Sequence, residues 1–321
     1  MYVLKRSGTG YKQDPTKFFE FSKYEKQCGD FVLIEAAFEQ AHQWEQFGLS
    51  DKDLDKIKKK KIVRLEFEEP NKFFIGDFET IYDKDFYKIF TLCPYTAKWL
   101  NAKYNVNKRV PVFFPFNKDY IPPKTKKEYD IIYTGHIVSQ KLLQDLRTIS
   151  RFNYRLVSNS KHSLVTNHGA SYTDKMKLIS KSRMTLVHNT LFPRPYHILN
   201  VWRIPDYYKN EAFKLFPKRY QLWKLFTDKN IYAPQLKSRV FEAAFGRSLI
   251  LCKRDPFNVI EHYFTPEREF IYFDDNNLEK TINKVLSNYK KYEKIIENAY
   301  QRAIINYTTE KFVEKYLKKL S

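Results

Sequence analysis

The apolar positions of this chain fall into short runs, which alternate with stretches where apolar residues recur every three or four positions. The short runs predict buried strands, and the periodic stretches predict helices. In the first half we expect strands at 31–34, 61–65 and 88–92, and a helix beginning at Pro94 after the third. This alternation is typical of a doubly wound parallel sheet.

The alternation begins again after Pro122 and Pro123. The pattern now predicts strands at 129–134, 154–158 and 184–188, with helices around Lys141 and over 172–182, the latter capped by Thr173. A long helical face follows from Leu278 to Ala303, and another helix starts near Phe312. We therefore expect an α/β protein of two domains, at 1–122 and 123–303, followed by a C-terminal helix at 304–321.

The second half is organised around residues 237–251, where a charged helix start leads through Gly246 into an apolar strand. Lys237 and Arg239 stand at the helix entrance, where free backbone N–H groups and the helix dipole favour a phosphate. Glu242, one turn further on, can accept two hydrogen bonds from ribose hydroxyls. Its alternative interpretation is a solvated carboxylate near a helix start. Gly246 would permit the turn into the strand.

These residues carry a resemblance to a known family. Lys237-x-Arg239-x-Phe241-Glu242, followed by Gly246, and the later motif over 264–278 resemble group 1 nucleotide-sugar glycosyltransferases, particularly their CgeB-like branch. The resemblance covers roughly residues 125 to 316. It implies a GT-B-like pair of Rossmann-type domains that face each other across a cleft, with the last helix crossing back to the first domain.

The resemblance also implies where the donor binds. The position of Glu242 corresponds to the second glutamate of the family's E-x₇-E motif, which binds the donor ribose, whereas the first corresponds to Pro234 here. Gly135 and Lys141 take the positions that contact the diphosphate. Tyr172 takes a position beside the nucleotide base. From its place at the end of a strand by the cleft edge, His188 is a candidate contact for the donor or the acceptor. For His188 a structural role is the alternative.

Charge development in the reaction points to Lys237 and Arg239 as catalytic. A departing nucleoside diphosphate gains negative charge, so two cations beside it stabilise the transition state more than the ground state. No metal and no other cofactor is expected, and Asp274 and Asp275 are interpreted as N-capping residues of the next helix. On the acceptor side, Glu68 or Glu69 could serve as the general base. A solvated acidic loop is the alternative there.

Residues 191–232 interrupt the second repeat. They contain eleven aromatic, eight basic and three acidic residues, a composition that suits sugar stacking, an anionic membrane surface or single-stranded nucleic acid. The alternative is a helical hairpin whose rings pack inward. The expected contacts with an acceptor or an anionic surface are Trp202, Tyr207, Tyr208 and Trp223, assisted by Arg194 and Arg203.

Composition narrows the choice of partner and compartment. The 57 basic and 37 acidic residues give a net charge of +20, which favours an anionic partner. The three widely spaced cysteines and the absence of an eighteen-residue apolar stretch predict a cytoplasmic protein, soluble or peripheral at the inner membrane face.

The sequence therefore predicts a metal-independent transfer of a sugar from a nucleotide-diphosphate donor to a hydroxyl of a glycan, a lipid-linked glycan or a protein. A basic nucleic-acid-binding protein, and a degenerate transferase fold that serves as an interaction module, are the alternatives.

Overall fold

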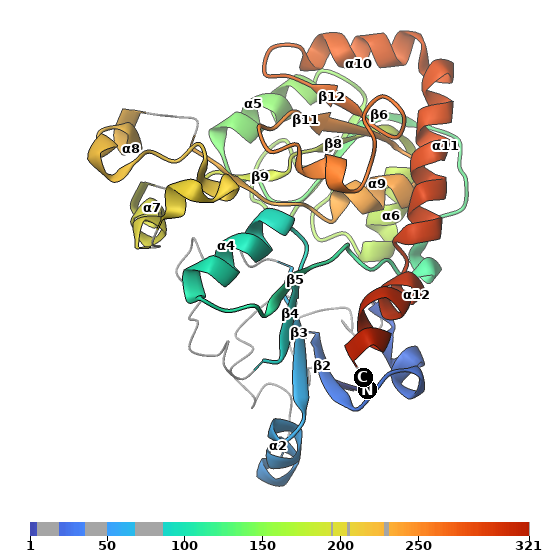
Figure 1. Ribbon diagram of the computed structural model, residues 1–321. Coiled ribbons are helices and arrows are strands. Elements are labelled where there is room, and N and C mark those ends of the chain that lie inside the picture. Colours follow the sequence, from blue (N-terminus) through green and yellow to red (C-terminus); the bar gives the residue numbers. More distant parts are fainter. Residues whose placement is uncertain are drawn as a thin grey trace. The chain divides into compact units, whose positions relative to one another are not determined.

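The computed structural model describes residues 1–4, 19–35, 50–67, 86–193, 195–203, 206–227 and 231–320 (Figure 1). Glu68, Glu69 and Arg194 lie outside these ranges. The chain separates into two compact units. The first unit contains residues 1–115, 190–235 and 309–321, and the second unit contains residues 116–189 and 236–308.

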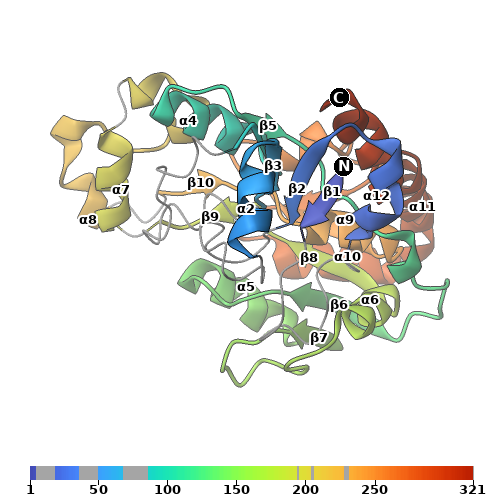
Figure 2. The same cartoon turned by 90° about the horizontal axis from the view of Figure 1, so that it is seen from below.

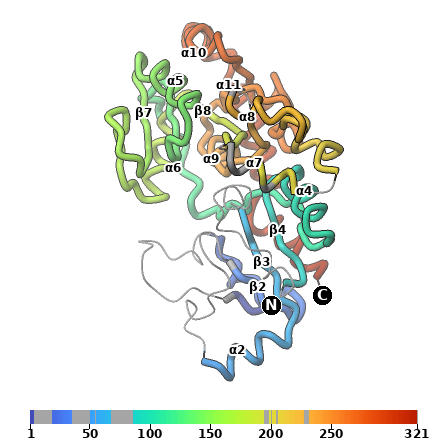
Figure 3. Tube along the Cα trace, turned by 90° about the vertical axis from the view of Figure 1, so that its left-hand side faces the viewer, coloured from blue at the N-terminus to red at the C-terminus, as the bar shows by residue number. Residues whose placement is uncertain are grey.

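The first unit is built on a five-stranded sheet in which all neighbouring strands are parallel. In spatial order its strands are β1 (Tyr2–Leu4), β2 (Phe31–Glu35), β3 (Lys61–Leu65), β4 (Lys88–Thr91) and β5 (Arg109–Pro111). Figure 3 shows β2, β3 and β4 next to one another. The strands predicted at 31–34, 61–65 and 88–92 are confirmed. Its helices before residue 110 are η1 (Phe21–Gln27), α2 (Asp51–Lys58) and α4 (Pro94–Tyr104).

Residues 190–235 belong to the first unit, which corrects their assignment to the donor domain. They form β9 (Thr190–Leu191), α7 (Pro195–Trp202), η5 (Tyr207–Lys209), η6 (Glu211–Phe213), η7 (Arg219–Gln221), α8 (Lys224–Thr227) and β10 (Ala233–Pro234). Figures 1 and 2 show α7 and α8 side by side, with α4 next to them. The physical reason is one apolar cluster, in which Trp99 of α4 packs edge-on against Phe213 with ring centroids 4.7 Å apart.

The chain returns to the first unit at Thr309, as the resemblance implies for the last helix. This end comprises α12 (Thr309–Phe312), η9 (Val313–Leu317) and η10 (Lys318–Leu320). Phe312 is fully buried, and its ring centroid lies 5.5 Å from that of Phe21 and 5.7 Å from that of Phe90. Aromatic burial thus holds the end of the chain on the first sheet.

The second unit also has a five-stranded parallel sheet, in the order β12-β11-β8-β6-β7. Its strands are β6 (Tyr129–Thr134), β7 (Tyr154–Val157), β8 (Ser182–Val187), β11 (Leu249–Lys253) and β12 (Ile271–Phe273). Its helices are η4 (Lys118–Tyr120), α5 (Gln140–Ile149), α6 (Tyr172–Ser180), α9 (Arg239–Phe245), η8 (Val259–His262), α10 (Leu278–Ser287) and α11 (Tyr289–Asn306). The strand order reverses between β6 and β8, and open α/β sheets bind ligands at the carboxyl ends beside such a point.

One local prediction is wrong, and another holds for a different physical reason. Ser171, not Thr173, caps α6, because its hydroxyl accepts a hydrogen bond from the backbone N–H of Asp174 at 3.1 Å. Gly246 has a negative φ of −80°, and the left-handed residue of that turn is Arg247, with φ of 49°. Gly246 instead provides space, since a Cβ atom there would lie 2.5 Å from Cγ2 of Ile179.

One lysine ties together three segments of the second unit. The Nζ of Lys127 donates to the backbone carbonyls of Ser180 at 2.7 Å, Ser182 at 3.0 Å and Arg247 at 2.6 Å. These carbonyls lie near the end of α6, at the start of β8 and in the turn between α9 and β11. Lys127 therefore fixes the ends of elements that are distant in sequence.

We predict that Lys127→Met lowers the free energy of unfolding by about 2–4 kcal/mol, because three carbonyls lose their donor. Urea unfolding followed by circular dichroism measures the change. Lys126→Met is the matched control, since Lys126 is exposed and one position away. Equal stabilities for the two variants would contradict this role.

Candidate functional site

Polar side chains gather at the carboxyl edge of the second sheet. Gly135 follows β6 directly and has a φ of 130°, a conformation that side chains disfavour. The guanidinium of Arg239, from the start of α9, lies against it: a Cβ atom at Gly135 would come within 2.2 Å of the Arg239 Nη2. The absence of a side chain at Gly135 is thus what admits the guanidinium.

Tyr133 supports Arg239 from the strand side. The Arg239 Cζ lies 4.6 Å from the centroid of the Tyr133 ring, and the Tyr133 hydroxyl donates to the carbonyl of His136 at 3.1 Å. No described residue forms a hydrogen bond or an ion pair with the Arg239 side chain, which is half-buried. Its five N–H donors match an anion such as a phosphate, which can accept two of them at once.

The start of α9 differs from the sequence expectation. Ser238 already has helical dihedral angles, so the first N–H groups of the helix are turned toward preceding carbonyls. The N–H of Val240 donates to Lys237 O at 3.2 Å, and those of Phe241 and Glu242 donate to Ser238 O at 2.9 and 3.1 Å. The predicted free N–H groups are therefore engaged at these three positions, and anion binding here depends on side chains.

Lys237 is anchored through its backbone. Its N–H donates to Oδ1 of Asn189 at 3.1 Å, and Asn189 is buried directly after β8. The Lys237 side chain is half-buried. The structure thus holds Lys237 and Arg239 two residues apart at the entrance to α9.

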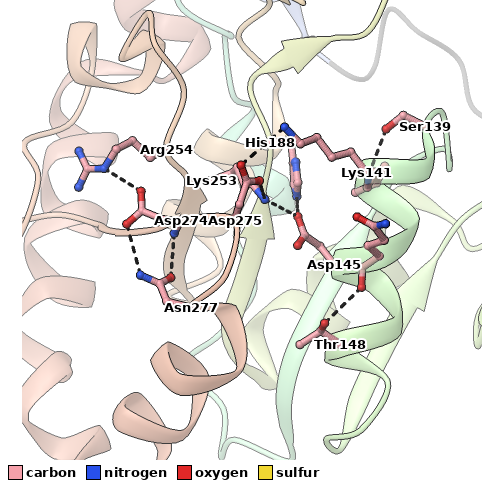
Figure 4. A network of polar contacts seen from close by, with 12 residues as sticks. Ser139, Lys141, Asp145, Thr148, His188, Lys253, Arg254, Asp274, Asp275 and Asn277 are labelled. Carbon is pink, nitrogen blue, oxygen red and sulfur yellow. Dashed lines mark hydrogen bonds and ion pairs between the residues drawn. The ribbon is translucent and has the colours of Figure 1, made fainter. Parts of the chain in front are cut away.

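A charged network continues along the same edge (Figure 4). Asp275, after β12, lies 2.7 Å from the Lys253 Nζ and 3.6 Å from the Lys141 Nζ. Lys253 also donates to Oδ2 of Asp145 at 3.0 Å. Lys253 lowers the pKa of Asp275 through a hydrogen bond, whereas burial raises the pKa of Asp145. The two lysines and Asp275 converge on the end of β8, where His188 lies.

Asp275 was expected to cap the following helix, and this is wrong. Asn277 is the residue at the cap position, and its Oδ1 accepts from the N–H of Asp274 at 2.8 Å. Asp274 pairs with Arg254, whose Nε lies 3.2 Å from its Oδ1. Two lysine ammonium groups attract the carboxylate of Asp275 toward the sheet edge and away from the helix.

His188 is buried at the end of β8. Burial, followed by the positive charges of Lys253 and Arg239, holds its pKa well below the ordinary value, so the ring is neutral. Its Nε2 lies 3.3 Å from Oδ2 of Asp145, but the two atoms are not aligned for a hydrogen bond. No described residue satisfies this nitrogen.

Glu242 is buried within the second unit, with 2% of its surface exposed. Its Oε1 accepts from the Lys175 Nζ at 2.8 Å and from the Tyr172 hydroxyl at 3.3 Å. Burial first, and then the charge of Glu242, raises the pKa of Tyr172, which remains a donor. No described residue bonds to the other oxygen, Oε2. A solvated carboxylate, the alternative interpretation of Glu242, is therefore wrong.

Tyr172 itself is not an open stacking surface. Its ring centroid lies 5.0 Å from that of Tyr120 and 6.3 Å from that of Phe116, and the Lys175 Nζ lies 4.2 Å from it. The contact of Tyr172 with Glu242 is what connects it to the site. Lys175 was missed by the sequence interpretation, although its spacing of three residues from Tyr172 on one helix would have indicated it.

Lys253, Asp145 and Tyr133 were also missed as individual site residues. Lys253 and Tyr133 sit in the strands β11 and β6, where a strand pattern gives no sign of a ligand. Asp145 is a polar residue in a helical pattern with no distinctive spacing. Only the packing of α5 beside β8 and β11 brings these groups together.

The acidic stretch that contains the predicted acceptor residues Glu68 and Glu69 is only partly described by the structure. Glu66, the first carboxylate of the acidic stretch, is fully buried and forms an ion pair with Arg64. Glu68 and Glu69 lie outside the described residues, so their predicted role as general base stays a prediction.

Two of the four aromatic contacts predicted in residues 191–232 are corrected. Trp202 and Tyr207 are 8% and 3% exposed, and both donate to the carbonyl of Pro217, at 3.0 and 2.9 Å. Buried polar atoms need partners, and Pro217 provides one to both rings. Tyr208 and Trp223 are exposed.

Within the described ranges, no three His, Cys, Asp or Glu side chains group as metal ligands. No helix there is long and apolar enough to cross a bilayer.

The sequence profile of the family described as glycosyl transferase-like matches residues 136–318. No curated protein sequence matches the chain.

Solved structures of glycosyltransferases with the GT-B fold resemble the chain at low identity. A variant of TarM from S. aureus, in complex with fondaparinux, α-GlcNAc-glycerol and UDP, has a TM-score of 0.54 at 10% identity, over 92% of this chain and 57% of that one. The pneumococcal O-GlcNAc transferase GtfA, in complex with UDP and GlcNAc, has a TM-score of 0.50 at 9% identity, over 94% and 58%. Sucrose-phosphate synthase from Thermosynechococcus elongatus has a TM-score of 0.51 at 8% identity, over 98% and 82%. The chain thus has a GT-B-like fold but spans under three fifths of the length of the first two proteins.

Because His188 is buried and neutral, we predict how the free energy of unfolding changes with pH. The unfolded chain binds a proton at His188 below its ordinary pKa of about 6.5, whereas the folded unit does not, so the free energy of unfolding falls as the pH falls below about 6.5. In His188→Gln this slope should decrease by up to about 1.4 kcal/mol per pH unit. Chemical unfolding between pH 7 and 5 measures it.

The control for this experiment is His168→Gln, which changes an exposed histidine of the same unit. It should leave the slope close to that of the unchanged chain. A slope that His188→Gln does not alter would show that His188 is protonated in the folded unit.

Proposed function

Because the chain belongs to the glycosyl transferase-like family, we propose that it transfers a sugar from a nucleoside diphosphate donor to an acceptor hydroxyl. The observation that carries this proposal is the guanidinium of Arg239, held over Gly135 without a carboxylate partner among the described residues. A donor diphosphate would supply the missing negative charge. Lys237, two residues away, and Lys141, on the helix after Gly135, would assist.

The transfer breaks the bond between the anomeric carbon of the sugar and an oxygen of the diphosphate. The electron pair of that bond goes to the diphosphate, the acceptor oxygen bonds to the anomeric carbon, and the acceptor proton goes to a base. Arg239 and Lys237 would neutralise the charge that develops on the leaving diphosphate, which lowers the barrier without a metal ion. The base would be Glu68 or Glu69.

Glu242 would bind the donor ribose through Oε2. Lys175 and Tyr172 hold the carboxylate through Oε1, so the second oxygen is fixed in position and can accept from a ribose hydroxyl. Pro234 stands in place of the family's first glutamate and provides no carboxylate. We propose that His188 contacts a hydroxyl of the donor sugar in place of that glutamate. Its ring is neutral, and its Nε2 has no aligned partner among the described residues.

The acceptor is a glycan in this proposal, free, lipid-linked or attached to protein. The complexes of TarM with α-GlcNAc-glycerol and of GtfA with GlcNAc support this choice, as does the UDP in both. A nucleic-acid-binding protein does not require a buried, positioned carboxylate such as Glu242. A degenerate transferase would bind the nucleotide and leave the sugar attached, so release of free sugar from a nucleotide sugar separates it from an enzyme.

We predict that Arg239→Ala weakens binding of the nucleoside diphosphate by about 10- to 150-fold, the loss of one charge-assisted hydrogen bond. It should also lower kcat, because its partner charge grows in the transition state. Titration calorimetry with UDP and a donor-hydrolysis assay measure the two effects.

Arg155→Ala is the matched control for Arg239→Ala. The Arg155 Cζ also lies over a tyrosine ring, 3.9 Å from the centroid of Tyr129, which is at the amino end of β6. This control should bind UDP as the unchanged chain does. A change in KM alone for Arg239→Ala would reduce the residue to substrate binding.

For Glu242, we predict a specific loss of ribose recognition. The unchanged chain should bind UDP about 10-fold or more tightly than 2′-deoxy-UDP, and Glu242→Gln should remove most of this preference. Lys175→Met, which frees Oε1 and keeps the carboxylate, should retain part of it. If Glu242→Gln discriminated as strongly as the unchanged chain, Glu242 would have no place in the donor site.

A further inference from the structure

Residues 206–226 of the first unit have an inner and an outer side. Phe213, Phe216 and Leu225 are buried in the apolar cluster with Trp99. On the outer side Leu222, Trp223 and Phe226, which we term the outer ridge, are 52%, 58% and 78% exposed. Large apolar side chains exposed together mark an interaction surface.

Backbone hydrogen bonds hold the outer ridge in one helical turn. The N–H of Leu225 donates to Leu222 O, and the N–H of Phe226 donates to Trp223 O, both at 3.1 Å. Residues three and four positions apart share a face of such a turn. Phe226 lies three positions from Trp223 and four from Leu222, so these three exposed side chains lie close together, whereas Leu225 is only 5% exposed.

Cations flank the outer ridge. An open cavity of about 600 Å³ is lined by residues that come before the outer ridge in the sequence. They are Asp206, Tyr207, Tyr208, Lys218, Arg219 and Tyr220. The carboxylate of Asp206 accepts from the Tyr208 hydroxyl and from the Lys209 Nζ, each at 3.1 Å, so this negative charge is compensated locally. Over residues 206–227 five basic residues oppose two acidic ones, a net charge of +3.

We propose that the outer ridge and its flanking cations dock onto a bilayer containing anionic lipids. Tryptophan and phenylalanine insert at the boundary between head groups and acyl chains, and nearby lysine and arginine side chains pair with lipid phosphates. This inference does not rest on the transfer reaction, because it concerns the first unit alone.

A protein partner and a nucleic acid fit these residues less well. The three ridge side chains expose on the order of 400 Å², about half of what one partner contributes to a standard protein interface. Single-stranded nucleic acid stacks on aromatic faces, and Leu222 offers none. Insertion into lipid uses aliphatic and aromatic side chains equally.

Co-sedimentation with vesicles tests the proposal. The full chain should bind vesicles of phosphatidylglycerol and phosphatidylcholine more tightly than vesicles of phosphatidylcholine alone. The double variant Trp223→Ser, Phe226→Ser should bind the mixed vesicles at least about tenfold more weakly. Ile305→Ser is the matched control, because Ile305 is an exposed apolar residue of the second unit, 59% accessible.

A second set of variants tests whether the lysines beside the outer ridge provide the preference for anionic lipid. Lys218→Glu with Lys224→Glu should remove the preference for phosphatidylglycerol, whereas Lys290→Glu, a control at an exposed lysine on α11, should not. Quenching of tryptophan emission by brominated lipid should occur in the unchanged chain. It should fall in Trp223→Phe, which keeps an apolar ring and so retains vesicle binding.

Several results would overturn the proposal. Equal sedimentation of the double variant and the unchanged chain would exclude the outer ridge as the contact. A concentration-dependent dimer that the double variant abolishes, without vesicle binding, would make it a protein interface. Binding to a single-stranded oligonucleotide that vesicles do not displace would assign the surface to nucleic acid. Melting curves and circular dichroism, unchanged by the outward-facing substitutions, show that each variant is folded.

Discussion

The candidate site of the second unit depends on one cation placed where no described carboxylate pairs with it. The Arg239 guanidinium rests between the ring of Tyr133 and the backbone of Gly135, a position that any side chain at residue 135 would obstruct. Guanidinium stacking on a ring stabilises a charge without neutralising it. The positive charge is thus available to a ligand, and the ligand best matched to it carries a phosphate.

Most of the other charged groups in the second unit are paired with one another. Lys253 pairs with Asp275 and Asp145, and Lys141 pairs with Asp275, which keeps a dense set of charges stable at the sheet edge. Burial first, and then the charges of Lys253 and Arg239, keep His188 neutral. Elsewhere in the second unit, Lys175 and Tyr172 hold one oxygen of Glu242. Pairing therefore fixes the geometry of most of these groups, and Arg239 stands out by contrast.

In the first unit, the aromatic side chains of residues 190–235 separate into buried and exposed sets. Rings that a propensity argument treats alike separate into a buried set, with Trp202 and Tyr207 bonded to Pro217, and an exposed set at the outer ridge. The buried set attaches residues 190–235 to α4. The exposed set lies next to a surplus of lysine and arginine, and it is the set we propose to contact an anionic bilayer.

The sequence by itself determined the strands, most helices and the segment that carries the site, because apolar periodicity and a charged helix start are local signals. Through a motif resemblance it also predicted a donor site that contains Gly135, Lys141, Arg239 and Glu242. Tertiary structure decided which partner each side chain meets: Asp275 turns to Lys253 and Lys141, not to its own helix, and Glu242 is buried beside Lys175. It also decided that residues 190–235 belong to the first unit, since the packing of Phe213 on Trp99 joins positions more than a hundred residues apart, and no local pattern records such a contact.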